Sequence, residues 1–107
     1  MPPNDRSYHL LFLNGIPGQA LTADVVGQHA AHLAELDRRG TLVLAGPLLG
    51  RVGGLVVLRT DTLAEARGIA EADPMVRGGF QSYEIVSWLL ANQRNGYQPA
   101  VPRPTDQ

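Results

Sequence analysis

The sequence of 107 residues predicts a single α+β domain built from four strands and two helices. Two stretches carry apolar residues at helical spacing behind a threonine N-cap, which is typical of helices packed against a core. Four short apolar runs have the length and composition of strands. Their order along the chain is strand, helix, strand, strand, helix, strand.

The first half of the chain predicts a strand over residues 8–13, followed by a long helix. The segment Asn14–Gly18, rich in turn-forming residues, separates the two elements. Thr22 is a suitable N-cap, and Gly40 stands where a glycine commonly follows the end of a helix. The helical stripe expected to face the core includes a histidine, and its members are Val25, Val26, His29, Leu33 and Leu36.

Three more apolar runs predict the remaining strands. Residues 41–45 and 55–59 are expected to be neighbouring strands, with a Gly-containing turn over residues 51–54 before the second of them. Residues 80–89 alternate imperfectly between apolar and polar positions, which indicates a final strand. With the first strand, these runs provide enough apolar surface for a four-stranded sheet.

The second helix has clear signals at both ends. Thr62 and Glu65 match a capping box, in which each residue satisfies a backbone amide of the other. The helix is expected to continue to about Ala72 and to stop at Asp73-Pro74, because proline disfavours helical geometry in the residue before it. Residues 76–79 are then expected to form a loop.

This order of elements predicts the ferredoxin-like βαββαβ arrangement, a four-stranded antiparallel sheet with both helices on one face. The other face would be left bare, and a bare apolar sheet face commonly packs on a second copy. We therefore expect a homodimeric α/β barrel with a cavity between two sheets. The expected organisation is a flexible N-terminal arm (1–7), the folded domain (8–90) and a Pro-rich C-terminal tail (91–107), which either is flexible or lies on a partner subunit.

The amino-acid composition excludes several classes of partner and of chemistry. The formal charge of −1 gives no basic surface for nucleic acid, and no apolar run is long enough to span a membrane, so a cytoplasmic protein is expected. The absence of cysteine excludes thiolate chemistry. All nine cationic residues are arginine, which excludes a lysine Schiff base. We expect a small-molecule substrate, no cofactor and no metal.

A histidine and an aspartate form the candidate catalytic pair. His29 falls on the apolar stripe of the first helix, and burying a histidine without a polar partner is costly. Asp73 supplies a carboxylate where the second helix ends. If the two meet, Asp73 can orient the imidazole of His29 for proton transfer. The alternatives are a core histidine bonded to a backbone carbonyl, and an Asp-Pro pair that only ends a helix.

Other residues are weaker candidates. His9, Tyr83 and Glu84 lie on predicted strands, where they would shape a substrate cavity or simply pack against their neighbours. His32 follows His29 by three residues, but helical metal ligands are usually spaced by four, so His32 is expected at the solvated edge of the helix.

These residues resemble the YciI-like (YCII-related) family of the dimeric α/β-barrel superfamily. The resemblance runs roughly over residues 8–88, and its ordered motifs are His29, Gly40, Thr41-Leu42, Ala45-Gly46-Pro47, Glu65-Ala66 and Asp73-Pro74. It implies a ferredoxin-like fold, a dimeric barrel and a site centred on His29 and Asp73. It also implies elimination chemistry on hydroxylated or chlorinated aromatic rings without a cofactor, although most of the family has no assigned activity. Members commonly have Arg-Pro where this chain has Val26-Gly27, so a ligand anion that the arginine would meet is not expected here.

The sequence thus predicts a cofactor-independent lyase or isomerase that performs His29-based proton transfer on a small cyclic phenolic or enolisable substrate. Two other classes remain open at this point. One is a non-catalytic small-molecule-binding or accessory module, which would release its ligand unchanged. The other is a cofactor-independent oxygenase, which would consume oxygen with an electron-rich aromatic anion.

Overall fold

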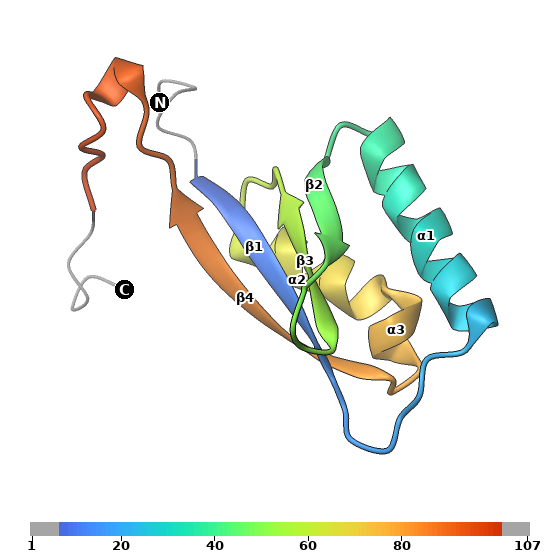
Figure 1. Cartoon of the computed structure of the whole chain (residues 1–107). Helices are drawn as coiled ribbons and strands as arrows, with labels where there is room; N and C mark the ends of the chain where they lie inside the picture. The colour runs from blue at the N-terminus through green and yellow to red at the C-terminus, as the bar shows by residue number, and fades with distance from the viewer. Residues whose placement is uncertain (1–6, 102–107) are drawn as a thin grey trace.

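The computed structural model describes residues 7–101 and shows one antiparallel sheet with helices packed against it (Figure 1). The sheet order is β2-β3-β1-β4, which confirms the predicted ferredoxin-like arrangement. Most of the predicted arm and the last residues of the tail lie outside the described residues. The elements in chain order are β1 (Ser7–Gly15), α1 (Ala23–Arg38), β2 (Leu42–Pro47), β3 (Gly53–Leu58), α2 (Leu63–Ala72), α3 (Pro74–Arg77), β4 (Gln81–Leu89) and the 3-10 helix η2 (Gln93–Asn95).

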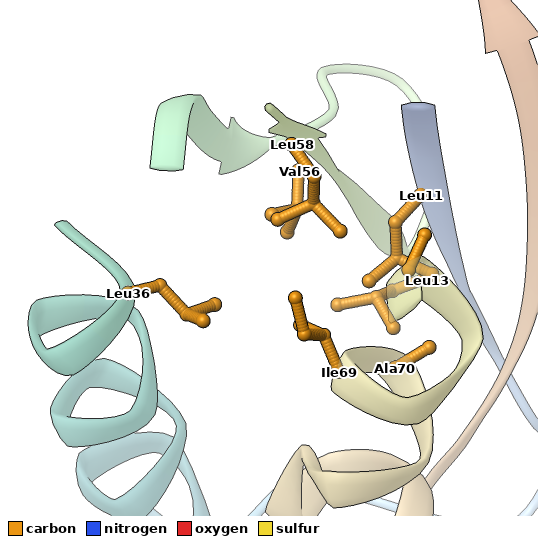
Figure 2. Packing of buried hydrophobic residues seen from close by; sticks show 8 residues of the cluster. Leu11, Leu13, Leu36, Val56, Leu58, Ile69 and Ala70 are labelled. Atoms are coloured by element: carbon orange, nitrogen blue, oxygen red, sulfur yellow. The ribbon is translucent and has the colours of Figure 1, made fainter. Parts of the chain in front are cut away.

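The core lies between the sheet and the helices. Leu11 and Leu13 of β1 face Ile69 of α2 and Leu36 of α1 across this layer (Figure 2). Because side chains alternate along a strand, the same face of β3 contributes every second residue to the core. The buried cluster consists of Leu11, Leu13, Leu36, Val56, Leu58, Ala66, Ile69 and Ala70.

The end of α1 is set by a Schellman motif, as the position of Gly40 predicts. The amide of Thr41 donates to the carbonyl of Leu36 at 2.9 Å, and the amide of Gly40 donates to the carbonyl of Asp37 at 3.0 Å. Gly40 has a φ of +79°, which a glycine adopts without steric cost. The motif turns the chain directly from α1 into β2.

The structure differs from the sequence prediction after Asp73. Residues 76–79 were expected to be a loop, but Pro74–Arg77 forms the short helix α3. Proline at the first helical position is already in helical φ and needs no amide donor, so the residue that stops α2 also starts α3. The side chain of Asp73 caps this new turn by accepting from the amide of Met75 at 2.9 Å.

Gly53, at the start of β3, is a position where we expect a large effect of substitution. Its φ is +146°, and a Cβ atom there would lie 2.3 Å from the carbonyl oxygen of Leu13, which is backbone and cannot move aside cheaply. We expect Gly53→Ala to lower the free energy of unfolding by about 2 kcal/mol or more. Chemical denaturation measures this change.

The matched control is Gly27→Ala in α1. A Cβ at Gly27 meets no atom within 4 Å, and alanine is the better helix former, so the variant should be about 0.5–1 kcal/mol more stable than wild type. Equal stability of the Gly53 and Gly27 variants would contradict the backbone contact described for Gly53.

The opposite face of the sheet carries no helix in the part of the chain that the structure describes (Figure 1). Strand alternation places Trp88, Val86 and Glu84 of β4 on this face, together with Leu44 of β2. Leu44, Val86 and Trp88 are 70%, 41% and 46% exposed, which is high for large apolar side chains in regular strands. Within residues 7–101, no helix has the length and apolar character needed to cross a bilayer.

Candidate active site

The structure brings His29 and Asp73 into contact across the α1–α3 boundary. The Nδ1 atom of His29 lies 2.7 Å from Oδ2 of Asp73, although 44 positions separate the two residues in the chain. The side chain of Asp73 is 1% exposed and that of His29 is 16% exposed. A carboxylate has only acceptor atoms, so Nδ1 is the donor in this hydrogen bond.

This contact defines which nitrogen of His29 is available for chemistry. Because Nδ1 carries its proton toward Asp73, the neutral ring keeps its lone pair on Nε2. The arrangement is that of an imidazole ring oriented by a carboxylate.

The side chain of Asp73 is held by one backbone amide as well as by His29. Its Oδ1 accepts from the amide of Met75, while Oδ2 accepts from His29, so both oxygens of this buried carboxylate have partners. The Pro74 ring keeps Asp73 in an extended conformation with φ −67° and ψ 127°. Asp73 therefore combines two structural contacts. Its Oδ1 caps α3, and its Oδ2 accepts the hydrogen bond from His29.

His29 lines an apolar pocket of about 460 Å³ formed by one chain. The pocket lies between α1 and the β2–β3 hairpin, so it differs from the cavity between two sheets that the sequence predicts. From α1 come residues at helical spacing: Val26, His29, Ala30 and Leu33. Val26 is 42% exposed and belongs to this pocket wall instead of the core.

Two polar residues of the pocket wall were missed by the sequence analysis. Of the described residues that line the pocket, His29, Arg51 and Gln81 carry charged, amide or imidazole side chains. Arg51 lies in the turn between β2 and β3, which the sequence suggests is only a turn, and its Nη2 donates to Oδ1 of Asn14 at 3.2 Å. Arg51 thus lines this pocket, although its guanidinium donates to Asn14 outside the lining, and α1 has Val26 where the resemblance implies an arginine.

The predicted substrate-binding residues do not gather at this pocket, and none of the three lines it. His9 is 4% exposed, lies on the helix-facing side of β1, and forms a hydrogen bond of 2.7 Å through Nδ1 with Oγ1 of Thr60. Glu84 lies on the uncovered face of the sheet. His9 and Glu84 therefore lie on opposite faces of the sheet, and their predicted roles stay predictions.

Tyr83 is the third of these residues, and it faces the helices. Its hydroxyl donates to Oε2 of Glu71 at 2.7 Å. This hydrogen bond to a carboxylate raises the pKa of Tyr83 above its usual value of 10.0, with burial as a second cause. Tyr83 therefore stays protonated at neutral pH and links β4 to α2, which is a structural contact.

His32 is half-buried, as expected for a residue at the edge of α1. Among residues 7–101, no group of three or more His, Cys, Asp or Glu side chains is arranged to hold a metal ion. His32 is also not among the residues that line the pocket of His29. A substitution of His32 is therefore a suitable control for substitutions of His29.

These features define a ferredoxin-like α+β domain with a His–Asp pair in the wall of an apolar pocket. The chain belongs to the YCII-related domain family, whose profile matches residues 7–89. An uncharacterized protein of Bacillus subtilis (strain 168), YjpA, is 35% identical over 65 residues, which cover 61% of this chain and 76% of that protein.

A solved structure has a similar fold. It is 5-chloro-2-hydroxyhydroquinone dehydrochlorinase (TftG) from Burkholderia phenoliruptrix AC1100, in complex with 2,5-dihydroxybenzoquinone. The TM-score is 0.62 at 21% identity, and the similarity covers 82% of this chain and 98% of the dehydrochlorinase. At this identity the similarity concerns the fold.

Proposed function

We propose that this protein is a cofactor-independent lyase or isomerase that transfers protons on a small phenolic or enolisable ring, with His29 as the general base. The observation that carries the proposal is the 2.7 Å contact between His29 and buried Asp73 at the wall of an apolar pocket. Histidine is suited to the role because it exchanges protons near neutral pH. The related fold of a dehydrochlorinase supports the lyase reading.

The volume and walls of the pocket suit a single ring. About 460 Å³ lies within the usual range for small-molecule sites, and the mostly apolar wall favours a planar carbon skeleton. We propose that the guanidinium of Arg51, a residue of this wall, turns toward the ring and stabilises the oxyanion that develops when a ring hydroxyl loses its proton. Asp73 acts as the positioning residue because it touches only His29 and the backbone.

For a chlorinated hydroxyhydroquinone, the proposed step is loss of HCl. A hydroxyl proton first moves to the chlorine-bearing carbon, which converts the ring to a dienone. Nε2 of His29 then removes a second hydroxyl proton, a new carbonyl forms, the ring double bond shifts, and chloride leaves with its bonding electron pair. The sum is one proton and one chloride lost, so the step needs no oxidant or reductant.

The test is an anaerobic incubation of the purified protein with 5-chloro-2-hydroxyhydroquinone and other chlorinated hydroxylated rings. Chloride release above the uncatalysed rate, which is lost in His29→Gln, is the expected result. Recovery of every ring unchanged but bound would identify a binding module. Oxygen uptake with no chloride release in a parallel aerobic assay would identify an oxygenase.

We also propose that the uncovered sheet face pairs with a second copy of this chain. Leu44, Val86 and Trp88 expose large apolar side chains there, and contiguous apolar surface of this kind marks interaction sites. We expect a dimer by light scattering after gel filtration. Val86→Arg should convert it to a monomer, because a desolvated arginine would face the partner.

The control for the dimer is Leu49→Arg. Leu49 is 99% exposed and lies between β2 and β3, outside the strands, so this variant adds the same charge away from the proposed interface. It should remain a dimer. A wild-type monomer at all concentrations measured, or a Val86→Arg dimer as tight as wild type, would contradict the interface.

A further inference from the structure

We propose that Gln81 is the residue of the His29 pocket that binds a second polar substituent of the ligand, so that the site selects rings with two hydroxyl groups over rings with one. The inference rests on the proposed function, since it assumes that a hydroxylated ring occupies this pocket. It assigns a specificity-determining role to a residue that takes no part in the proposed proton transfer.

The first observation is an unsatisfied buried atom. Gln81 is 5% exposed, and its Oε1 has no hydrogen-bond partner in the protein. Among residues 7–101, it is the one buried side-chain nitrogen or oxygen atom that has no hydrogen-bond partner. Native proteins pair nearly all such atoms, because an unpaired buried acceptor lowers stability.

The other buried polar side chains show how consistently this chain satisfies such groups. His9 and Thr60 bond to each other, and Asp73 uses both carboxylate oxygens. Gln81 differs from them in that it also lines the pocket of His29. The residue that carries the unsatisfied atom therefore also lines the pocket, and Oε1, which is shielded from solvent as the side chain stands, meets a ligand once the amide turns toward the pocket.

The chemistry of an amide fits a ring hydroxyl. A glutamine side chain offers one acceptor and two donors, and a half-turn of its broad terminal torsion exchanges the carbonyl oxygen and the NH2 group. A hydroxyl is matched to both, since it can donate to the carbonyl and accept from the NH2 group. With His29 meeting one oxygen of the ring, Gln81 provides the contact for another.

The backbone of Gln81 belongs to a paired strand, which holds the residue in a fixed place beside the pocket. It is the first residue of β4 and pairs in register with Gly15 of β1, which fixes its backbone. On the same face of β4 follow Tyr83 and Ile85, which pack against the core. A leucine or methionine would continue this apolar pattern, so the amide of Gln81 departs from the apolar character of its surroundings.

The experiment compares phenol with the three benzenediols (catechol, resorcinol and hydroquinone) as ligands, by titration calorimetry and NMR. In wild type, the best diol should bind about fivefold to tenfold more tightly than phenol, which is the worth of one extra hydrogen bond. Gln81→Met should abolish this preference, and the side-chain amide signals of Gln81 in wild type should shift with the diol only. Gln98→Met, at an exposed position, should keep the preference.

Stability separates a ligand-binding role from a structural one. Gln81→Met removes a buried acceptor without a partner, so its thermal midpoint should equal or exceed that of wild type. A preference for diols that persists in Gln81→Met, or Gln81 amide signals that do not respond to any diol, would overturn the inference. Binding is measured here without turnover, so absence of chloride release would count against the proposed reaction and leave the role of Gln81 standing.

Discussion

Replacing His29 with glutamine should lower turnover of an accepted ring by about 10²–10⁴-fold, the usual contribution of a general base. Glutamine has a similar reach and can still occupy the pocket wall, but it cannot accept a proton near neutral pH. The expected signature is a loss in kcat with little change in KM, because the contact that is lost acts mainly in the transition state. Initial rates of chloride release over a range of substrate concentrations measure both constants.

The control for this prediction is His32→Gln on the same helix. His32 does not line the pocket, so its substitution tests whether loss of any histidine from α1 has the same effect. We expect near-wild-type rates. A His29→Gln protein that is folded by circular dichroism and retains full turnover would exclude His29 as the base.

Removing the carboxylate of Asp73 should produce a large loss of stability. Asp73→Ala deletes the N-cap of α3, worth about 1 kcal/mol, and leaves the half-buried Nδ1 of His29 without its acceptor, worth about 1–3 kcal/mol more. Together these terms give about 2–4 kcal/mol. For a domain of this size, the thermal midpoint should fall by about 10 °C or more.

The asparagine variant separates the two roles of Asp73. Asp73→Asn keeps the shape of the side chain and one carbonyl oxygen for the amide of Met75, so the capping contact survives. The carboxylate that orients and charge-balances His29 is lost, and kcat should fall by about 10²-fold or more at a KM close to wild type. Asp24→Ala, an exposed acidic position in α1, should change neither property beyond about 0.5 kcal/mol of stability.

Equal losses of stability in the alanine and asparagine variants would contradict this division. So would an asparagine variant that keeps wild-type kcat, because the carboxylate would then matter only as a helix cap.

Local signals in the sequence were sufficient for the fold. Thr22 and Thr62 both cap helices in the structure, and Gly40 ends α1 through hydrogen bonds between neighbouring residues. Such contacts depend on the chain within a few positions, so the residue types reveal them. The contact between His29 and Asp73 is a conditional prediction of the sequence, supported by a histidine on an apolar stripe, a carboxylate at a helix end and the family resemblance. The structure shows the contact, while the catalytic roles stay predictions.

The pocket itself depends on long-range packing, which residue patterns do not encode. The glycines around Arg51 predict only a turn. Arg51 lines the pocket because the β2–β3 hairpin packs beside α1 in the folded chain. A polar residue near the start of a strand is typical of a solvent-exposed position, so the sequence does not single out Gln81, which is buried in the structure. The sequence predicts Asp73-Pro74 as the end of a helix followed by a loop, but proline is equally suited to the first position of a new helix, which is the place it takes in α3.

The double use of Asp73 also has a spectroscopic consequence. One carboxylate joins the imidazole of His29 to the backbone amide of Met75, through Oδ2 and Oδ1 respectively. Any event that changes the charge or position of the imidazole must alter the field at that amide. The nitrogen and proton frequencies of Met75 thus form an internal reporter of the site, readable in the unmodified protein before any substrate is known.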